Sequence, residues 1–139
     1  MIAVDSSVII AGVLSWHEFH QRALPSLEKA IAGRRLLIPL PVLVESYSVL
    51  TRLPSPHRLR PEIAFELLHE TFVAARLTGL SNRRAWVFLR ECVETGTSGG
   101  RVYDAVIASA AIEARASELL TFNPRDFEAF RDRIAIVVP

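Results

Sequence analysis

The chain opens with MIAVDSSVIIAGVL (residues 1–14), where a short apolar run ends at an aspartate and a longer apolar segment follows. Short apolar runs of this kind are typical of buried strands, and longer amphipathic segments are typical of helices. We therefore expect a strand over Ile2–Val4 and a helix over Ser7–Leu14. The same alternation continues along the chain, and it favours an α/β fold with a mainly parallel sheet.

The remaining elements follow from the same pattern. Further strands are expected at Leu36–Ile38, Ala75–Leu77, Leu119–Thr121 and Ile134–Val138. Further helices are expected at His17–Ala32, Pro41–Leu53, Pro61–Thr71, Asn82–Thr95 and Val102–Ala116. Proline suits the first turn of a helix, and Pro25 is expected to start or kink the helix in which it lies. The expected architecture is a three-layer α/β fold, with a central, mainly parallel sheet of four or five strands flanked by helices.

Length and composition fit a single domain over residues 1–139. Half of the residues are hydrophobic and 22% are charged, a balance that supports a packed core and argues against disorder. The lone Cys92 cannot form an internal disulfide and stands in an apolar stretch, so we expect it to pack. The first residues hold no basic leader and no segment reaches about 18 uninterrupted apolar residues, so we expect a cytoplasmic protein without a membrane span.

The basic residues are fifteen arginines and the single Lys29. Arginine is well suited to bidentate contacts with phosphate groups. Three arginine groups are candidates for contacts with RNA phosphates, with plain solvation as the alternative: Arg34–Arg35, Arg52 with Arg58 and Arg60, and Arg83–Arg84. The formal net charge of +1, from 16 basic and 15 acidic side chains, does not by itself indicate a nucleic-acid-binding protein.

Two aspartates stand where this fold class places its sites. Asp5 directly follows the first strand, and ligands of open parallel sheets bind outside the carboxyl ends of the strands. The alternative for Asp5 is that it caps the helix that follows. Asp104 opens the apolar helix Val102–Ala116, although a first-turn aspartate can also serve only the free backbone amides and the helix dipole.

Glu45 lies in the apolar stretch VLVESYSVL (residues 42–50). At helical spacing it shares a face with Val42 and Val49, so its carboxylate is expected to point toward buried surface. A buried charge must be compensated, and a structural arginine partner is the alternative to a functional site.

The segment LLTFNPRDF (residues 119–127) brings a strand end and a turn together. The strand ends at Thr121, and the turn carries Asn123 and Asp126 at another carboxyl end. Asn-Pro is also an ordinary turn signal, so this segment alone does not indicate a site.

Acids that are widely spaced in sequence can converge on one pocket of an α/β fold. Their like charges repel unless a cation neutralises them. An all-oxygen set without Cys or His suits Mg²⁺ or Mn²⁺ rather than zinc, and hydrolysis of a phosphodiester is the chemistry that such an ion serves.

With these segments in view, the chain resembles the PIN-domain ribonucleases and, in its size and motifs, the VapC toxins of toxin–antitoxin pairs. The matching motifs occur in order along nearly the whole chain: Val4-Asp5-Ser6-Ser7-Val8, Glu45 in its helix, Val102-Tyr103-Asp104-Ala105, and Leu120 to Phe127. The resemblance implies that Asp5, Glu45 and Asp104 form an acidic metal site, assisted by hydrogen bonds from Ser7 and Thr121.

The sequence departs from the family pattern at Asn123, where many members carry an aspartate. Either Asp126 supplies the missing charge as a fourth catalytic and metal-binding acid, or Asn123 serves as a neutral ligand. The departure leaves open how many ions bind at once, because fewer carboxylates neutralise less metal charge.

The resemblance implies an endoribonuclease that uses Mg²⁺ (or Mn²⁺) to activate the attacking water. It also implies a second copy of the chain and an antitoxin as partners, and the apolar excess of helices Pro41–Leu53 and Pro61–Thr71 suggests surface for them. Two alternatives stay open. One is a non-enzymatic PIN-like interaction module, which the neutral side chain of Asn123 favours. The other is a receiver-like or haloacid-dehalogenase-like phosphoryl-transfer protein, for which Ser7 and the mid-helix Lys29 are poorly placed.

Two weaker motifs have no clear role in sequence. His17-Glu18-Phe19-His20 spaces two histidines as some metal sites do, and the alternative is a solvated helix start. The loop Gly96–Gly100 could hold an anion or admit substrate beside Asp104, or could be a flexible connection.

Overall fold

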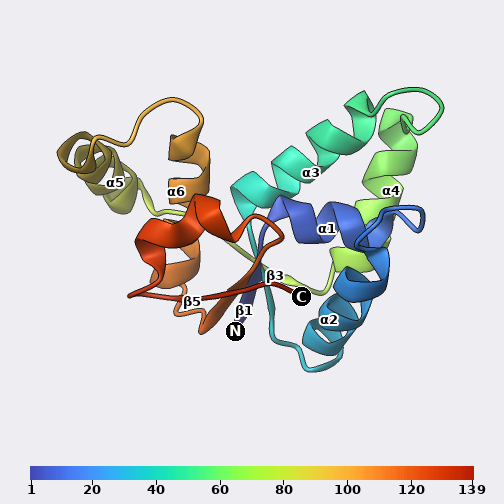
Figure 1. The fold of residues 1–139 in the computed structure, drawn as a ribbon, viewed down its shortest axis with the longest axis horizontal. Coiled ribbons are helices and arrows are strands. Elements are labelled where there is room, and N and C mark those ends of the chain that lie inside the picture. Colours follow the sequence, from blue (N-terminus) through green and yellow to red (C-terminus); the bar gives the residue numbers. More distant parts are fainter.

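The computed structural model describes residues 1–139 as a five-stranded parallel sheet flanked by helices (Figure 1). The strands are β1 (Ile2–Val4), β2 (Leu36–Pro39), β3 (Arg76–Thr78), β4 (Glu118–Leu120) and β5 (Ala135–Val137). The helices are α1 (Ser6–Val13), α2 (His20–Ala32), α3 (Leu40–Arg52), α4 (Pro61–Phe72), α5 (Asn82–Thr95), α6 (Arg101–Glu113) and the 3₁₀ helix η1 (Pro124–Phe130). The expected fold class is confirmed.

The sheet has the strand order β3-β2-β1-β4-β5. The chain therefore builds outward from β1 to β3 and then crosses back to place β4 on the other side of β1. Open parallel sheets bind their ligands at such a reversal, outside the carboxyl ends of the two strands that flank it. Here those strands are β1 and β4, which pair in register with Val4 opposite Leu120.

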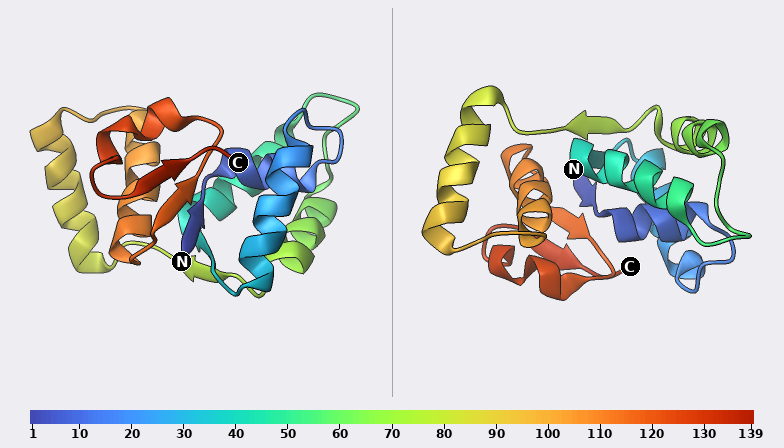
Figure 2. Two further views of the ribbon diagram at one scale, coloured as in Figure 1. Left: turned by 60° about the horizontal axis from the view of Figure 1, so that its bottom comes forward. Right: turned by 90° about the horizontal axis from the view of Figure 1, so that it is seen from above.

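The core lies against the middle of the sheet. All four residues of β2 are buried, as are Ala3 and Val4 of β1, whereas the edge strand β3 is largely exposed. Helix α1 is buried over Val8–Gly12 and packs on α2, where a Cβ at Gly12 would collide with Leu27. Helix α5 lies at one end of the molecule and the pair α3–α4 at the other (Figures 1 and 2).

Most predicted elements occur within one or two residues of their expected bounds, and the predicted start of the second helix is wrong. That helix begins at His20 rather than His17, because residues 17–19 form a turn in which the Phe19 N–H donates to His17 Nδ1. Pro25 lies inside the helix and does not start it. The buried side chains of Ala23 and Leu27 hold the helix to the core on both sides of the proline.

Cys92 bears out a smaller expectation. The thiol of Cys92 is buried beside Phe88 and Ala105, and burial raises its pKa, as expected of a packing residue. None of the helices is both long enough and apolar enough to serve as a membrane span.

Candidate active site

Asp5 and Thr121 lie side by side at the carboxyl edge of the sheet. Each residue follows one member of the registered pair Val4 and Leu120, so parallel pairing alone brings them together. The Asp5 N–H donates to the Leu120 carbonyl at 2.9 Å, which extends the hydrogen bonding between β1 and β4 by one bond. Both residues are buried, Asp5 at 5% exposed and Thr121 at 0%.

The Asp5 carboxylate accepts three close hydrogen bonds. They come from the Ser6 N–H at 2.7 Å, the Ser7 hydroxyl at 2.7 Å and the Thr121 hydroxyl at 2.9 Å. The bond from Ser6 makes Asp5 the N-cap of α1, so the capping role expected as an alternative is present as well. The carboxylate is therefore held in one orientation by residues from two separate segments.

The same hydroxyls also fix the loop after β4. Thr121 Oγ1 accepts from the Asn123 N–H at 2.9 Å, and Ser7 Oγ accepts from the Phe122 N–H at 3.0 Å. The start of α1 and the turn that opens η1 are thereby joined through Asp5. Of these residues, Asn123 is exposed at the surface of the site.

Asp104 lies in the first turn of α6 and faces the other acids. Its carboxyl has a pKa raised to about 6, chiefly by burial and then by the charges of Asp126, Asp5 and Glu45, in that order of importance. The structure thus brings all four predicted acids into one electrostatic cluster. No Lys, Arg or His lies within ion-pair distance of any of them. The ion pairs of the chain instead join Arg84 to Glu91 and Glu113, and Arg131 to Glu128.

The prediction that Glu45 points toward buried surface is wrong. The buried face of α3 carries Val42, Ser46 and Leu50, and Glu45 is exposed. Ser46 can occupy the core because its hydroxyl donates to the Val42 carbonyl at 2.8 Å. Glu45 therefore needs no structural arginine partner, and its carboxylate lines an open pocket instead.

This pocket, of about 720 Å³, lies between α3 and the start of α6. One wall carries Glu45, Ser48 and Arg52, which recur at helical spacing along α3. The opposite wall carries Asp104, Tyr103 and Gly100, so the glycine-rich loop reaches the pocket through its last residue. Glu45 and Asp104 thus stand in a hollow large enough for part of a polymer chain.

The donor set of the cluster fits Mg²⁺ or Mn²⁺, because every candidate ligand is a carboxylate oxygen. No three Asp, Glu, His or Cys side chains come close enough together to hold one ion between them. Mg²⁺ is usually bound by one or two carboxylates and completes its shell with water and phosphate oxygens. Any two carboxylates of the cluster would supply the number of protein ligands that this mode requires.

Comparison with known families supports this assignment of the fold. The model of the PIN domain family matches residues 2–132. The chain belongs to the PIN domain family. The PIN domain is 34% identical to "Ribonuclease VapC40" of Mycobacterium tuberculosis over 145 aligned positions, which cover 99% of this chain and 97% of that protein. It is 40% identical to "Ribonuclease VapC27" of the same species over 127 positions, with 89% and 85% covered.

A solved structure has the same fold as the PIN domain. It is VapBC2 from Rickettsia felis bound to a DNA fragment from their promoter, with a TM-score of 0.71 at 17% identity, covering 100% of this chain and 99% of that chain. The likeness at this identity concerns the fold, so the roles of individual residues rest on their geometry.

Sequence reasoning did not single out every residue of the site in this PIN domain. Ser48 and Tyr103 line the acid pocket, and Ser6 donates its N–H to Asp5. Ser48 could have been identified in the sequence from its helical spacing from Glu45 and Arg52. Tyr103, exposed by 69%, could have been found only as a large aromatic residue next to Asp104.

The three arginine groups lie in different places in the PIN domain. Arg52 lines the acid pocket. Arg34 and Arg35 precede β2, so they lie at the opposite edge of the sheet from the acids. Arg84 is engaged with Glu91 and Glu113. Arg52, at the end of α3, is therefore the best placed of these arginines to contact a phosphate near the acids.

Proposed function

We propose that this chain is a divalent-metal-dependent endoribonuclease and the toxin of a VapBC-type toxin–antitoxin pair. The observation that carries the proposal is the raised pKa of Asp104, whose causes include the charges of Asp126, Asp5 and Glu45. Four acids without a basic partner are costly to hold together unless a cation binds among them. Membership of the PIN family and the ribonuclease names of the relatives support RNA as the substrate.

In the proposed mechanism, Asp5 and Asp104 would hold Mg²⁺ or Mn²⁺. A bound ion of this kind lowers the pKa of a water and stabilises negative charge on the phosphate. Ser7 and Thr121 fix the Asp5 carboxylate through their hydrogen bonds at 2.7 and 2.9 Å. Glu45 and Asp126, which are both exposed, orient a water or receive its proton, and Asn123 contacts the phosphate.

Arg52 has a role in holding the substrate. Its guanidinium lines the pocket that contains Glu45 and Asp104 and has no carboxylate within ion-pair distance. A guanidinium that is free of internal partners can form a bidentate contact with a phosphate. We assign it to a phosphate of the RNA that lies beyond the cleaved bond.

The test is cleavage of total cellular RNA by the purified chain with Mg²⁺ or Mn²⁺ and with EDTA, followed by mapping of the product ends. We expect cleavage with metal only, and loss of cleavage by at least about a hundredfold in Asp5→Asn and Asp104→Asn. Asp132→Asn is the matched control, because Asp132 is exposed and lies outside the cluster. Cleavage by either site variant at the parent rate would contradict the assignment.

Measurement of metal binding separates this proposal from a non-enzymatic PIN module. We expect Mn²⁺ to bind the parent protein and to bind Asp5→Asn more weakly. A chain that neither binds the metal nor cleaves RNA would favour the interaction module, and turnover of a small phosphate ester without RNA cleavage would favour a phosphoryl-transfer protein.

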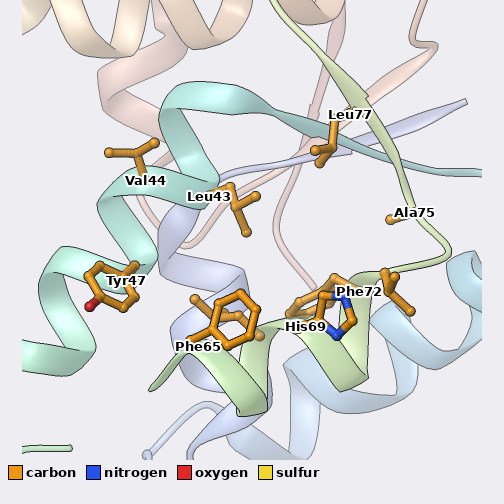
Figure 3. Close-up of a pocket in the computed structure, with 10 residues that line it drawn as sticks. Leu43, Val44, Tyr47, Phe65, His69, Phe72, Ala75 and Leu77 are labelled. Carbon is orange, nitrogen blue, oxygen red and sulfur yellow. The ribbon is translucent and has the colours of Figure 1, made fainter. Parts of the chain in front are cut away.

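An antitoxin partner is supported by an apolar groove beside the site (Figure 3). The groove, of about 460 Å³, is formed by α3, α4 and the segment into β3: Leu43, Val44, Tyr47, Phe65, Leu68, His69, Phe72, Val73, Ala75 and Leu77. Val44, Phe65 and Val73 are each at least 60% exposed. Exposed apolar surface of this kind marks a site for a protein partner.

The groove is continuous with the acid pocket, because Val44 lines both hollows. A partner segment that fills the groove with apolar side chains can therefore reach Glu45 and Asp104 with its next residues. We propose that the antitoxin covers the acids in this way and that its reaching side chains are basic.

The second proposed partner is another copy of this chain. Helix α5 exposes Trp86 by 77%, Leu89 by 48% and Val93 by 81%, and these residues recur at helical spacing on one side of the helix. We assign this side of α5 to a homodimer interface, away from the groove between α3 and α4 (Figure 2).

A further inference from the structure

A second hollow lies beside the hydrogen-bond network of Asp5. It has a volume of about 320 Å³ and is lined by Ser6, Ser7, Ile10, His17, Glu18, Phe19, Val49, Phe122 and Asn123. This size is near the lower limit of small-ligand pockets, so it suits a single flat group rather than a length of chain. Ser7 belongs both to this hollow and to the hydrogen-bond network of Asp5, so a group bound here lies next to the acids.

The hollow has a fixed aromatic wall. The rings of Phe19 and Phe122 stack with centroids 4.5 Å apart and an interplanar angle of 18°. The guanidinium of Arg22 lies 5.6 Å from the centroid of Phe19 and 5.5 Å from that of Phe122. These contacts join the loop after α1 to the loop after β4. An aromatic wall of this kind is a general feature of sites for the bases of single-stranded RNA.

Two polar side chains that line the hollow keep groups free of partners within the protein. The Phe19 N–H donates to His17 Nδ1 at 3.1 Å, and this bond assigns the proton of the neutral imidazole to Nε2, which is then a free donor. Glu18 is exposed and forms no ion pair, so its carboxylate is a free acceptor. A donor and an acceptor from adjacent residues thus line one small hollow.

This arrangement also decides between the two interpretations of the motif His17-Glu18-Phe19-His20. His20 Nδ1 is bonded to the Ala11 carbonyl at 2.9 Å, and His17 Nδ1 is occupied by Phe19. No group of three Asp, Glu, His or Cys side chains here could bind a metal ion. The motif is therefore the turn that leads into α2, because His20 begins the helix while His17 and Glu18 line the hollow.

We propose that this hollow binds the base of the nucleotide next to the cleaved phosphodiester and that His17 and Glu18 select that base. The inference rests on the proposed ribonuclease function. The Glu18 carboxylate accepts from an exocyclic amino group, which adenine, cytosine and guanine carry and uracil lacks. His17 donates from Nε2 to a ring nitrogen or a carbonyl of the same edge. The site therefore favours an amino-bearing base over uracil.

The experiment uses a library of short RNAs that are randomised at every position, with Mg²⁺ and sequencing of the product ends. We expect the parent chain to disfavour uracil by about tenfold at one position that flanks the cut. Glu18→Gln is expected to remove most of that discrimination, because a glutamine amide can donate to the uracil carbonyl. His17→Ala is expected to weaken base discrimination at the same position only.

A matched control carries the same substitution at an exposed position of α4. Glu62→Gln lies outside the hollow and outside the groove, and it is expected to leave the base preference of the parent unchanged. A binding measurement with Asp104→Asn, using the best-cleaved RNA and its uracil-substituted form, is expected to show the same preference without cleavage.

The possible failures are distinguishable. A parent chain that cleaves no RNA in the library contradicts the proposed function. A parent chain that cleaves RNA but tolerates uracil at every flanking position contradicts the inference about base selection. It does not contradict the proposed ribonuclease function. The inference is likewise overturned if Glu18→Gln and His17→Ala both retain the base preference of the parent.

Discussion

At the scale of single residues, Asp104 is placed for function at the expense of stability. Its pKa is about 6 in the folded protein, against 3.8 for an ordinary aspartate. A carboxyl with a raised pKa in the folded state stabilises the protein most below its unfolded pKa, and this stabilisation is lost as pH rises through the folded pKa. Ionised Asp104 therefore destabilises the metal-free protein above about pH 6.

Asp104→Asn should consequently raise the Tm of the metal-free protein at pH 8. The gain should shrink as pH falls from 6 toward 4, where Asp104 of the parent takes up its proton. Thermal unfolding in EDTA across this pH range measures the effect. Asp132→Asn is the control and should show no such trend, whereas a lower Tm for Asp104→Asn at pH 8 would contradict a destabilising charge at this position.

Thr121 provides a second residue-scale prediction. It is fully buried, donates to Asp5 and accepts from the Asn123 N–H, so Thr121→Val removes two hydrogen bonds without a large change of shape. We expect a loss of about 1–3 kcal/mol in the free energy of unfolding together with slower RNA cleavage. Urea denaturation and initial rates measure both.

Thr71→Val is the matched control for this change. The Thr71 hydroxyl also donates a hydrogen bond, to the Leu67 carbonyl at 2.7 Å, but the residue is exposed on α4. Thr71→Val should lower the free energy of unfolding by less than about 0.5 kcal/mol and should cleave RNA at the parent rate. Equal losses in the two variants would mean that the Asp5 network contributes nothing specific.

At the scale of elements, the apolar side of α5 predicts self-association. Val93→Asp or Trp86→Lys places a charge on a side whose residues are up to 81% exposed, so the monomer should remain folded. We expect the parent to sediment as a dimer and both variants as monomers, because a charge in an apolar interface is costly. A parent chain that is monomeric at tens of micromolar in analytical ultracentrifugation would rule out this interface.

Helix α3 serves several surfaces at once because its residues face in different directions. Val42, Ser46 and Leu50 face the core, Glu45 and Arg52 face the acid pocket, and neighbouring apolar residues face the groove. A change on one side can therefore be made without disturbing the others, which makes the helix suitable for separating partner binding from catalysis.

At the scale of the whole molecule, the charge is divided between a pocket and a surface. If the four clustered acids bind metal, the remaining side chains number 16 basic against 11 acidic, a formal charge of +5 in place of +1. The near-neutral total therefore conceals an acidic pocket within an arginine-rich surface. This distribution is compatible with RNA as a substrate.

The groove between α3 and α4 predicts how the activity is controlled. Phe65→Asp introduces a charge at an exposed groove residue that lies outside the acid pocket, so RNA cleavage should keep the parent rate. Binding of the proposed VapB-type antitoxin should weaken by at least about tenfold, and the antitoxin should no longer inhibit cleavage. Unchanged inhibition of Phe65→Asp would place the partner elsewhere. Val93→Asp on α5 is the control for a surface charge.

The sequence alone determined the elements, the fold class and the candidate acids. Strand and helix periodicities are local, so Ile2–Val4 and Asn82–Thr95 were predicted with the bounds that the structure has. The position of Asp5 after β1 also followed locally, because parallel sheets expose the carboxyl ends of their strands. The resemblance to PIN ribonucleases rests on the same local motifs, and the family match confirms it.

Only the tertiary structure decided what those residues face. Glu45 lies in an apolar helix and yet is exposed, because the contacts of α3 with its neighbours select which side of the helix is buried. The turn at His17 and Glu18 became a pocket wall only when Phe19 stacked on Phe122, a residue more than a hundred positions away. Such contacts depend on strand order and register, which no local pattern of residues encodes.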